Sequence, residues 1–183
     1  MLNAIGFWIT NLRDDALPSP QELVGDMPAS LREQLASYLT AGHRFRQFRG
    51  YSWCRFDCGI QYSQMGSWDL TDGTWVWPEG LPHYVREHGI VLPSEFVAHV
   101  LAGAAPRQPS PSEEISADFW RQWSATRRSS EFLKALRTAQ DSAEVWISAA
   151  KAELPLAVVE AQALHGGLRD LLREFSPAPR GSS

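Results

Sequence analysis

The chain has 183 residues, of which 44% are hydrophobic and 21% are charged, a composition typical of one globular domain with a sizeable core. The 17 basic and 21 acidic residues give a net charge of −4, which argues against bulk electrostatic capture of nucleic acid or of an anionic membrane. Two cysteines are too few for a disulfide framework, and the first residues lack the basic leader and long apolar stretch of a signal peptide. Because no apolar stretch could span a membrane, we expect a cytoplasmic protein.

The first half of the chain predicts a mixture of strands and helices. Aromatic and β-branched residues at 4–9 predict a strand, and apolar residues at 31, 35, 38 and 39 share one face of a helix that ends at Gly42. Residues 44–77 alternate in the pattern of strands, including 51–56. Within them, Asp72-Gly73 predicts the turn of a hairpin between 67–71 and 74–77, since glycine adopts the positive φ that such a turn needs.

The second half of the chain predicts helices. Apolar spacing favours short helices at 81–88 and 93–101, which Gly89 and Gly103 would end. Residues 104–114 are rich in proline and serine and predict an exposed linker, and 115–175 predict a helical region. Its first helix either continues or restarts after 127–130, and the helix cost of Gly166-Gly167 would allow a break there. Residues 176–183 predict a disordered tail.

These elements predict an α+β fold. We expect a domain at 1–103, in which a small antiparallel sheet packs against helices, followed by the linker and a helical C-terminal half. The stretch from 43 to 99 holds both cysteines, four of the five histidines and three of the four tyrosines. A functional site is therefore expected there.

One candidate site combines cysteines and histidines. Cys54 and Cys58, followed by His83 and His88, are two pairs of the residue types that bind zinc. The 24 residues between the pairs exceed a usual finger loop, and histidines five apart on a regular helix point about 140° away from each other. Alternatives are half-buried thiols beside hydrogen-bonded histidines, a Cys54–Cys58 disulfide, or a redox pair.

A second candidate site is acidic. Asp69, Asp72 and Glu79 flank the predicted hairpin close to His83 in sequence, and such a group could carry out general acid–base catalysis or bind a hard metal in a hydrolase. Each residue also has a structural explanation: Asp72 as a turn residue, Glu79 at a helix N-terminus and Asp69 as a solvent-facing strand residue.

A third feature interleaves basic and aromatic residues at 43–51. This pattern is found in binders of single-stranded nucleic acid, but the net negative charge argues against that role, and an edge strand gives the same pattern. For a surface that binds another protein, aromatic and arginine side chains are the expected anchors. The first candidates are Arg44, Arg46, Trp68, Trp75 and Trp77.

Three segments carry a resemblance to a known family. The runs GYSWCRFDCG at 50–59, MGSWDLTDGTWVWPEGLPHYVREHGIVLP at 65–93 and EFVAHV at 95–100 resemble a small family of uncharacterised bacterial proteins, which share the CRF-x-CG, LTDG and WPEGL-x-HYV segments. The resemblance covers about a quarter to a third of the chain. It implies a bacterial source and no activity.

The sequence therefore supports three hypotheses of function. The first is a non-catalytic cytoplasmic protein that binds another protein, for example an immunity-type antidote that occludes a toxin, with no cofactor. The second is a binding module stabilised by zinc at Cys54, Cys58, His83 and His88. The third is a metal-dependent hydrolase that uses the acidic group with His83.

Overall fold

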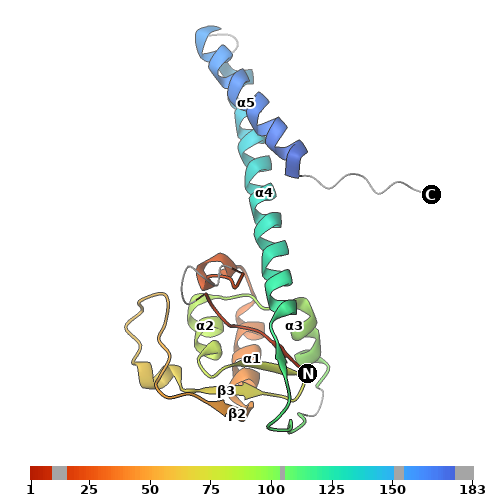
Figure 1. Ribbon diagram of the computed structural model, residues 1–183. Coiled ribbons are helices and arrows are strands. Elements are labelled where there is room, and N and C mark those ends of the chain that lie inside the picture. The colour runs from red at the N-terminus through yellow and green to blue at the C-terminus, as the bar shows by residue number, and fades with distance from the viewer. Residues whose placement is uncertain (10–15, 104–105, 151–154, 176–183) are drawn as a thin grey trace, which may run out of the picture. The chain divides into compact units, whose positions relative to one another are not determined.

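The computed structural model of the chain describes residues 1–9, 16–103, 106–150 and 155–175 (Figure 1). The fold is α+β, as predicted, with a five-stranded sheet, helices around it and a helical C-terminal half. The strands are β1 (Leu2–Ala4), β2 (His43–Gln47), β3 (Trp68–Thr71), β4 (Trp75–Pro78) and β5 (Ile115–Ser116). The helices of the first half are η1 (Pro20–Leu23), α1 (Ala29–Thr40), η2 (Tyr62–Met65), α2 (Leu81–His88) and α3 (Ser94–Leu101).

The sheet is mixed, with strand order β2-β3-β4-β1-β5. The strands β2, β3 and β4 pair antiparallel, and the predicted hairpin is confirmed, with Gly73 at a φ of +88°. The prediction of an antiparallel sheet is wrong for β1, which pairs in parallel with both β4 and β5. A parallel pair needs a long crossover, and the segments between β1 and its two partners supply it.

Two predicted strands differ in the structure. The strand predicted at 4–9 is wrong in position: β1 spans Leu2–Ala4 and shares only Ala4 with it. The chain leaves the extended conformation at Gly6, which has a φ of +71°. Residues 51–56 form a loop instead of a strand. In this loop the side chains alternate without any pairing to a neighbouring strand. Cys54 is buried and attaches the loop to the core, whereas Trp53 is exposed.

The main core lies between one face of the sheet and the helices α1, α2 and α3 (Figure 1). Trp75, Trp77 and Leu70 point into this core from β4 and β3, whereas Val76, between the two tryptophans, belongs to a smaller cluster on the opposite face. This division follows from the two-residue period of a strand. Burial of Trp77 is complete, and its indole N–H donates to the carbonyl of Leu39 at 3.1 Å.

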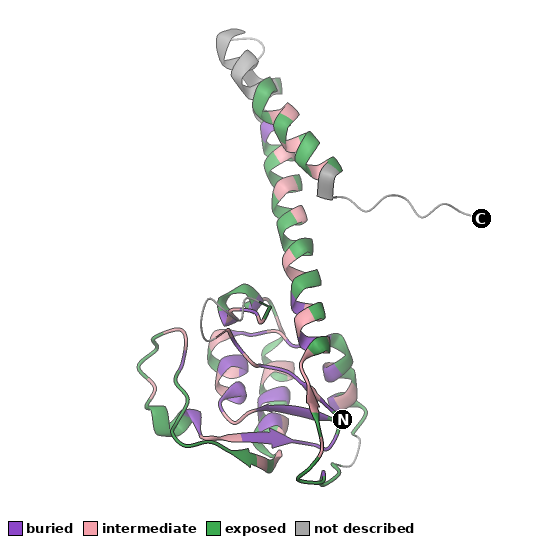
Figure 2. Cartoon of the chain, in the orientation of Figure 1, coloured by how far each residue is buried: buried purple, intermediate pink, exposed green. Residues whose placement is uncertain are grey.

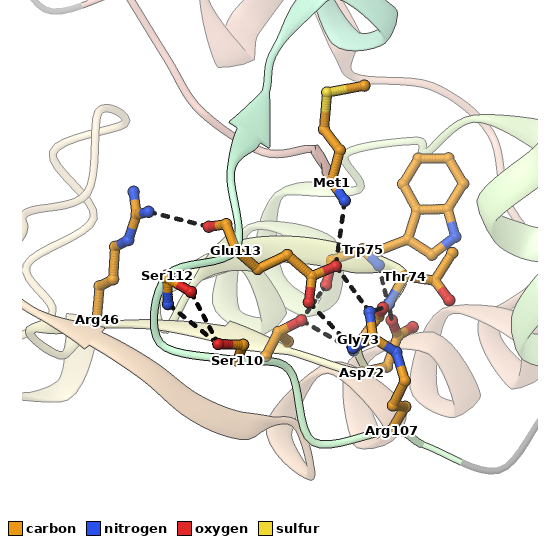
Figure 3. A network of polar contacts seen from close by, with 11 residues as sticks. Met1, Arg46, Asp72, Gly73, Thr74, Trp75, Arg107, Ser110, Ser112 and Glu113 are labelled. Atoms are coloured by element: carbon orange, nitrogen blue, oxygen red, sulfur yellow. Dashed lines mark hydrogen bonds and ion pairs between the residues drawn. The ribbon is translucent and has the colours of Figure 1, made fainter.

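The predicted linker is part of the first compact unit, which spans residues 1–125. Among its described residues, Arg107 donates to the carbonyl of Gly73 and forms a double hydrogen bond with Glu113, at 3.0 and 2.8 Å (Figure 3). The Glu113 carboxylate also accepts a hydrogen bond from the amino group of Met1 at 3.2 Å. The backbone carbonyl of Glu113 accepts one from the guanidinium of Arg46, also at 3.2 Å. This compact unit extends past the domain boundary predicted at 103, because polar contacts, β5 and the buried Trp120 continue it.

The second unit comprises residues 126–183 and is helical in its described part. Helix α4 (Asp118–Ala150) continues through 127–130, which is one of the two alternatives, and α5 (Pro155–Phe175) contains Gly166 and Gly167 without interruption. Figure 2 shows that buried residues gather in the first unit, whereas the described side chains of α4 beyond residue 125 and of α5 are mostly exposed or half-buried. The tail predicted at 176–183 lies outside the described residues.

Candidate metal centre

The two cysteines lie in the long loop between β2 and β3. Several contacts outside the cysteines hold this loop. The Tyr84 hydroxyl donates to the carbonyl of Trp53 at 3.2 Å and accepts from the amide of Arg55 at 3.0 Å, and Ser52 donates to the carbonyl of Gly66 at 3.0 Å. Between the cysteines the chain turns sharply, with a φ of +48° at Asp57. The turn brings both sulfur atoms to one side of the loop, where they meet helix α2.

The two histidines lie at the middle and at the end of α2. His83 occupies the third position of the helix and His88 the last, and Gly89 ends the helix in the left-handed conformation with a φ of +64°. The Nε2 atoms of the histidines lie 3.1 Å apart. The two imidazoles therefore meet despite the divergence expected for a regular helix, and His88 is the last residue of that helix.

Four potential ligand atoms converge in this place. The sulfur of Cys54 lies 3.2 Å from Nε2 of His88 and 3.4 Å from Nε2 of His83, and the sulfur of Cys58 lies 3.4 Å from Nε2 of His83. All four atoms lie within 4.8 Å of one another. No other group of three or more such residues with metal-binding spacing occurs in the part of the chain that the structure describes.

These distances fit a tetrahedral zinc site. Zinc binds sulfur at about 2.3 Å and imidazole nitrogen at about 2.0 Å, so tetrahedral angles would place two nitrogens about 3.3 Å apart and a sulfur about 3.5 Å from a nitrogen. The observed 3.1 Å between the histidines and 3.2–3.4 Å from sulfur to nitrogen lie close to both values. A shift of a few tenths of an ångström would accommodate the ion.

The surroundings of the cluster suit a metal with thiolate ligands. The amide of Phe56 donates to the sulfur of Cys54 at 3.4 Å, and the ring of Phe56 stacks on His88 with centroids 4.2 Å apart. Such contacts orient ligands and stabilise thiolate charge. Cys54 is buried and Cys58 is exposed, and an open depression of about 520 Å³ lined by Cys58, His83 and Glu87 gives solvent a route to the cluster.

Burial sets the protonation of the cluster when it holds no ion. Desolvation lowers the pKa of both imidazoles, and the neighbouring His88 lowers the pKa of His83 further. A lowered pKa favours the neutral form of the imidazole, which is the form that binds metals. Desolvation raises the pKa of the Cys54 thiol. Both cysteines are free thiols, so the structure contains no Cys54–Cys58 disulfide.

The acidic candidate site is not assembled. Asp72 accepts from the amides of Thr74 and Trp75, both at 2.7 Å, and its other oxygen lies 2.9 Å from both the hydroxyl of Tyr38 and Nε2 of His99. It is a turn residue, as its structural explanation proposed, and it belongs to a polar network with a tyrosine and a histidine that the sequence did not connect.

The other members of that candidate site have separate surroundings. Glu79 accepts from the amides of Ser67 and Trp68, at 2.8 and 3.2 Å, whereas His83 belongs to the metal cluster. Asp69 is buried at 4% exposure, which contradicts its expected solvent-facing position, and desolvation raises its pKa to about 6. Because Asp72 bonds within its own turn and to Tyr38 and His99, whereas Glu79 bonds to the amides of Ser67 and Trp68, these residues do not form a shared metal or water site.

The predicted partner-binding residues divide into two groups. Trp75 and Trp77 lie in the core with 6% and 0% exposure, so in this structure they offer no surface to a partner. Arg44 and Arg46 are exposed, and the guanidinium of Arg44 lies over the half-buried ring of Trp68 at 5.2 Å. The two-residue period of a strand places both β4 tryptophans on the same face of the sheet. That face packs against the helices, so both side chains are buried.

Sequence reasoning missed the largest exposed aromatic side chains of the first unit. Phe48, Tyr51, Trp53 and Tyr62 are 56%, 60%, 47% and 67% exposed and lie within the segment that carries the cysteines. The interleaving of aromatic and basic residues at 43–51 was the available signal. It extends to Trp53 and Arg55, whose guanidinium lies 4.0 Å from the centre of the Trp53 ring.

Comparison with known proteins adds no relationship. No family model matches the chain, and neither a curated protein nor a solved structure matches it. The resemblance to a bacterial family therefore stays a prediction. Within the described residues, no helix combines the length and apolar character needed to cross a membrane.

Proposed function

We propose that this chain is a zinc-stabilised binding module whose partner is another protein. The observation that carries the zinc part is the convergence of Cys54, Cys58, His83 and His88, from two segments distant in sequence, on one point. Two thiolates and two imidazoles are the donor set that zinc prefers in structural sites.

A structural role for the metal is favoured over a catalytic one. Four protein side chains fill the tetrahedral positions, whereas catalytic zinc sites keep one position for water or substrate. Glu79, one of the carboxylates of the hydrolase hypothesis, accepts two backbone hydrogen bonds away from the four ligands. The geometry of the four ligands thus supports stabilisation of the fold.

The metal would fasten the β2–β3 loop to α2. The loop comprises the 20 residues between Gln47 and Trp68 and has only the short η2 as regular structure, so it depends on isolated contacts. A zinc ion would add two bonds on the loop and two on the helix. Because the unfolded chain lacks such a preformed site, most of the metal-binding free energy would appear as stability of the fold.

The exposed aromatic and arginine side chains of the same segment support the protein-binding part. Tyr, Trp, Phe and Arg are enriched at protein interfaces, and large apolar side chains at the surface mark interaction sites. Trp53 and Tyr51 are exposed beside Arg49 and Arg55. An immunity-type antidote in the cytoplasm is one role that such a module could fill.

The zinc part is tested by native mass spectrometry of freshly purified, reduced protein. We expect a mass increase of one zinc per chain, lost in both His88→Gln and Cys58→Ser. The matched control is His43→Gln, which removes a half-buried histidine of β2 outside the cluster. Elemental analysis identifies the metal.

Two results would contradict the zinc assignment. One is a metal-free protein that does not take up added zinc with a Kd below the micromolar range. The other is a bound metal that the His88→Gln and Cys58→Ser variants retain. In either case the thiols and imidazoles would be a hydrogen-bonded cluster of the kind that the cysteine spacing also allowed.

A further inference from the structure

We infer that the 48–62 segment, the part of the β2–β3 loop from Phe48 to Tyr62, is a docking surface for an acidic protein segment that also carries apolar side chains. The inference rests on the proposed function, because zinc would hold this segment in its binding conformation. It names the class of partner. The argument uses the exposure of the segment, its anchoring and its charge.

The segment turns different side chains inward and outward. Cys54, Phe56 and Ile60 pack against the main core. Four large aromatic side chains face solvent, with exposures between 47% and 67%: Phe48, Tyr51, Trp53 and Tyr62. A loop that uses only small or half-buried side chains as anchors gains no folding energy from this exposed aromatic area, which is therefore available for a partner.

The charge of the region selects the partner. The 48–62 segment contains Arg49 and Arg55 against Asp57 alone, whereas the whole chain has a net charge of −4. Arg44 and Arg46 precede it on β2, where Arg44 lies 4.0 Å from Glu79 and Arg46 donates to the carbonyl of Glu113. Arg49 is exposed, and the guanidinium of Arg55 lies on the ring of Trp53 at 4.0 Å. A cation on an aromatic face presents charge and apolar surface together, so a carboxylate beside an apolar side chain complements it.

Nucleic acid is the competing partner, because stacking and phosphate contacts use the same side chains. The remainder of the chain is more acidic than the chain as a whole, so its field would repel a polyanion of high charge density beyond the contact area. A protein segment carries fewer charges and brings apolar side chains for Tyr51 and Tyr62 to contact. The charge distribution therefore favours a protein.

The zinc clamp would preorganise this surface. Both cysteines lie within the segment, and Cys54 stands between Trp53 and Arg55 in sequence. With the loop fixed to α2 in the free protein, binding would not have to pay the entropy of ordering it. Loss of the metal should therefore weaken binding without removing any contacting side chain.

The test is fluorescence anisotropy with the full chain, loaded with zinc. One probe is a short fluorescein-labelled peptide in which Asp and Glu alternate with Leu, and the other is a labelled oligouridine of the same length. We expect the peptide to bind, with an affinity that falls as salt rises. Arg49→Glu should weaken it at least about fivefold, and Trp53→Ala about tenfold.

The controls match each change elsewhere in the chain. Arg137→Glu makes the same charge reversal on α4, and Leu101→Ala removes a side chain that is 55% exposed at the end of α3. Neither should change the affinity by more than about twofold. The zinc content of every variant is measured in the same samples.

Three results would overturn the docking inference: no binding of the peptide by the zinc-loaded protein, equal losses in the variants and their controls, or tighter binding of the oligouridine than of the peptide. Failure of the zinc proposal looks different. In that case the protein would carry no zinc, yet the peptide would bind with the stated dependence on Arg49 and Trp53.

Discussion

The imidazole Nε2 atoms of His83 and His88 lie 3.1 Å apart, although five positions on one helix separate the two residues. Residues so spaced in a regular helix point in different directions. The contact exists because α2 ends at His88, and Gly89 takes the chain away with a φ of +64°. The end of the helix, rather than the ligand spacing alone, creates the candidate metal site.

The first prediction follows from this helix end. Gly89→Ala should destabilise the fold by about 1 kcal/mol, because a side chain rarely adopts positive φ, and should weaken zinc binding about tenfold through displacement of His88. Space alone is not the obstacle, since the nearest atom to an added Cβ, the carbonyl oxygen of Gly25, would lie 3.6 Å away. Urea unfolding and a competitive zinc titration measure the two effects.

The control for that prediction is Gly103→Ala. Gly103 has a φ of +65°, follows α3 and has no atom within 4 Å of an added Cβ. The substitution therefore strains the backbone in the same way, but at a position outside the candidate metal centre. The control should lose similar stability and keep its zinc affinity. Equal zinc affinities in the two variants would mean that the end of α2 does not position His88 for metal binding.

A second prediction concerns the loop that carries the cysteines. Chelation of zinc should speed tryptic cleavage after Arg49 and Arg55 about tenfold, because local opening of the loop would then no longer break metal bonds. Cleavage after Arg137 in α4 provides the internal reference within the same digest. Mass spectrometry of timed samples identifies each site, and an unchanged ratio of loop to α4 cleavage after chelation would contradict the clamp.

A third prediction uses the buried carboxyl group of Asp69. Its pKa is raised from 3.8 to about 6 in the folded protein, so between these values the folded state binds more protons than the unfolded state. The free energy of unfolding should therefore decrease as pH rises from about 4 to about 6, by roughly 2–3 kcal/mol from this group. Arg46 opposes the shift, and desolvation outweighs it.

The variant Asp69→Asn tests this pH dependence. It should match the natural protein near pH 4 and be more stable at pH 7 to 8, because a neutral amide avoids the cost of ionisation. Asp26→Asn, at an exposed position, is the matched control. Metal-linked titrations are common to all three proteins and cancel in their differences. A natural protein that is as stable as Asp69→Asn at pH 8 would refute the prediction.

Local patterns in the sequence were enough to predict the elements whose conformation depends on residues that are neighbours in the chain. The hairpin at Asp72-Gly73 and the helices that end at Gly89 and Gly103 depend on glycine φ and on amphipathic spacing, both visible in short windows. The parallel pairing of β1 could not be predicted in this way. It depends on which distant strands reach the same sheet, and no window contains that information.

The candidate site shows the same limit. The four ligands were named from residue type and spacing, but their convergence depends on the turn at Asp57 and on the position of His88 at a helix end. The acidic candidates were close in sequence but have separate contacts, because Asp72 binds the amides of its own turn whereas Glu79 binds amides at the start of β3. Proximity in sequence therefore predicted an acidic site that the structure does not assemble. Distance in sequence argued against the cysteine and histidine cluster, which the structure does assemble.

A fourth prediction contrasts a core tryptophan with a surface one. Trp77→Ala should cost about 3–5 kcal/mol, because it removes a fully buried ring and a hydrogen bond to Leu39. Trp53→Ala should cost less than about 1 kcal/mol, since the ring is 47% exposed. Urea unfolding followed by circular dichroism compares them. Similar costs for both would mean that Trp53 is a core residue and not an interface residue.

The last prediction concerns the extent of the first unit. A fragment of residues 1–125 should fold cooperatively, whereas a fragment of residues 1–103 should not, because it lacks β5 and the buried Trp120. The indole N–H of Trp120 donates to the carbonyl of Phe7 at 2.8 Å, and its ring packs against Trp8 with centroids 5.7 Å apart. Its loss leaves an apolar cavity and an unpaired carbonyl in the core.

Thermal unfolding of the two fragments, followed by near-ultraviolet circular dichroism with zinc present, distinguishes them. The longer fragment should show a single sharp transition and the aromatic signal of packed tryptophans, and the shorter one should show neither. Zinc binding by the shorter fragment should not rescue it, because the candidate ligands lie in the β2–β3 loop and on α2 and cannot replace the missing edge strand β5. A cooperative transition in the 1–103 fragment would place the domain boundary where the Pro/Ser composition predicted it.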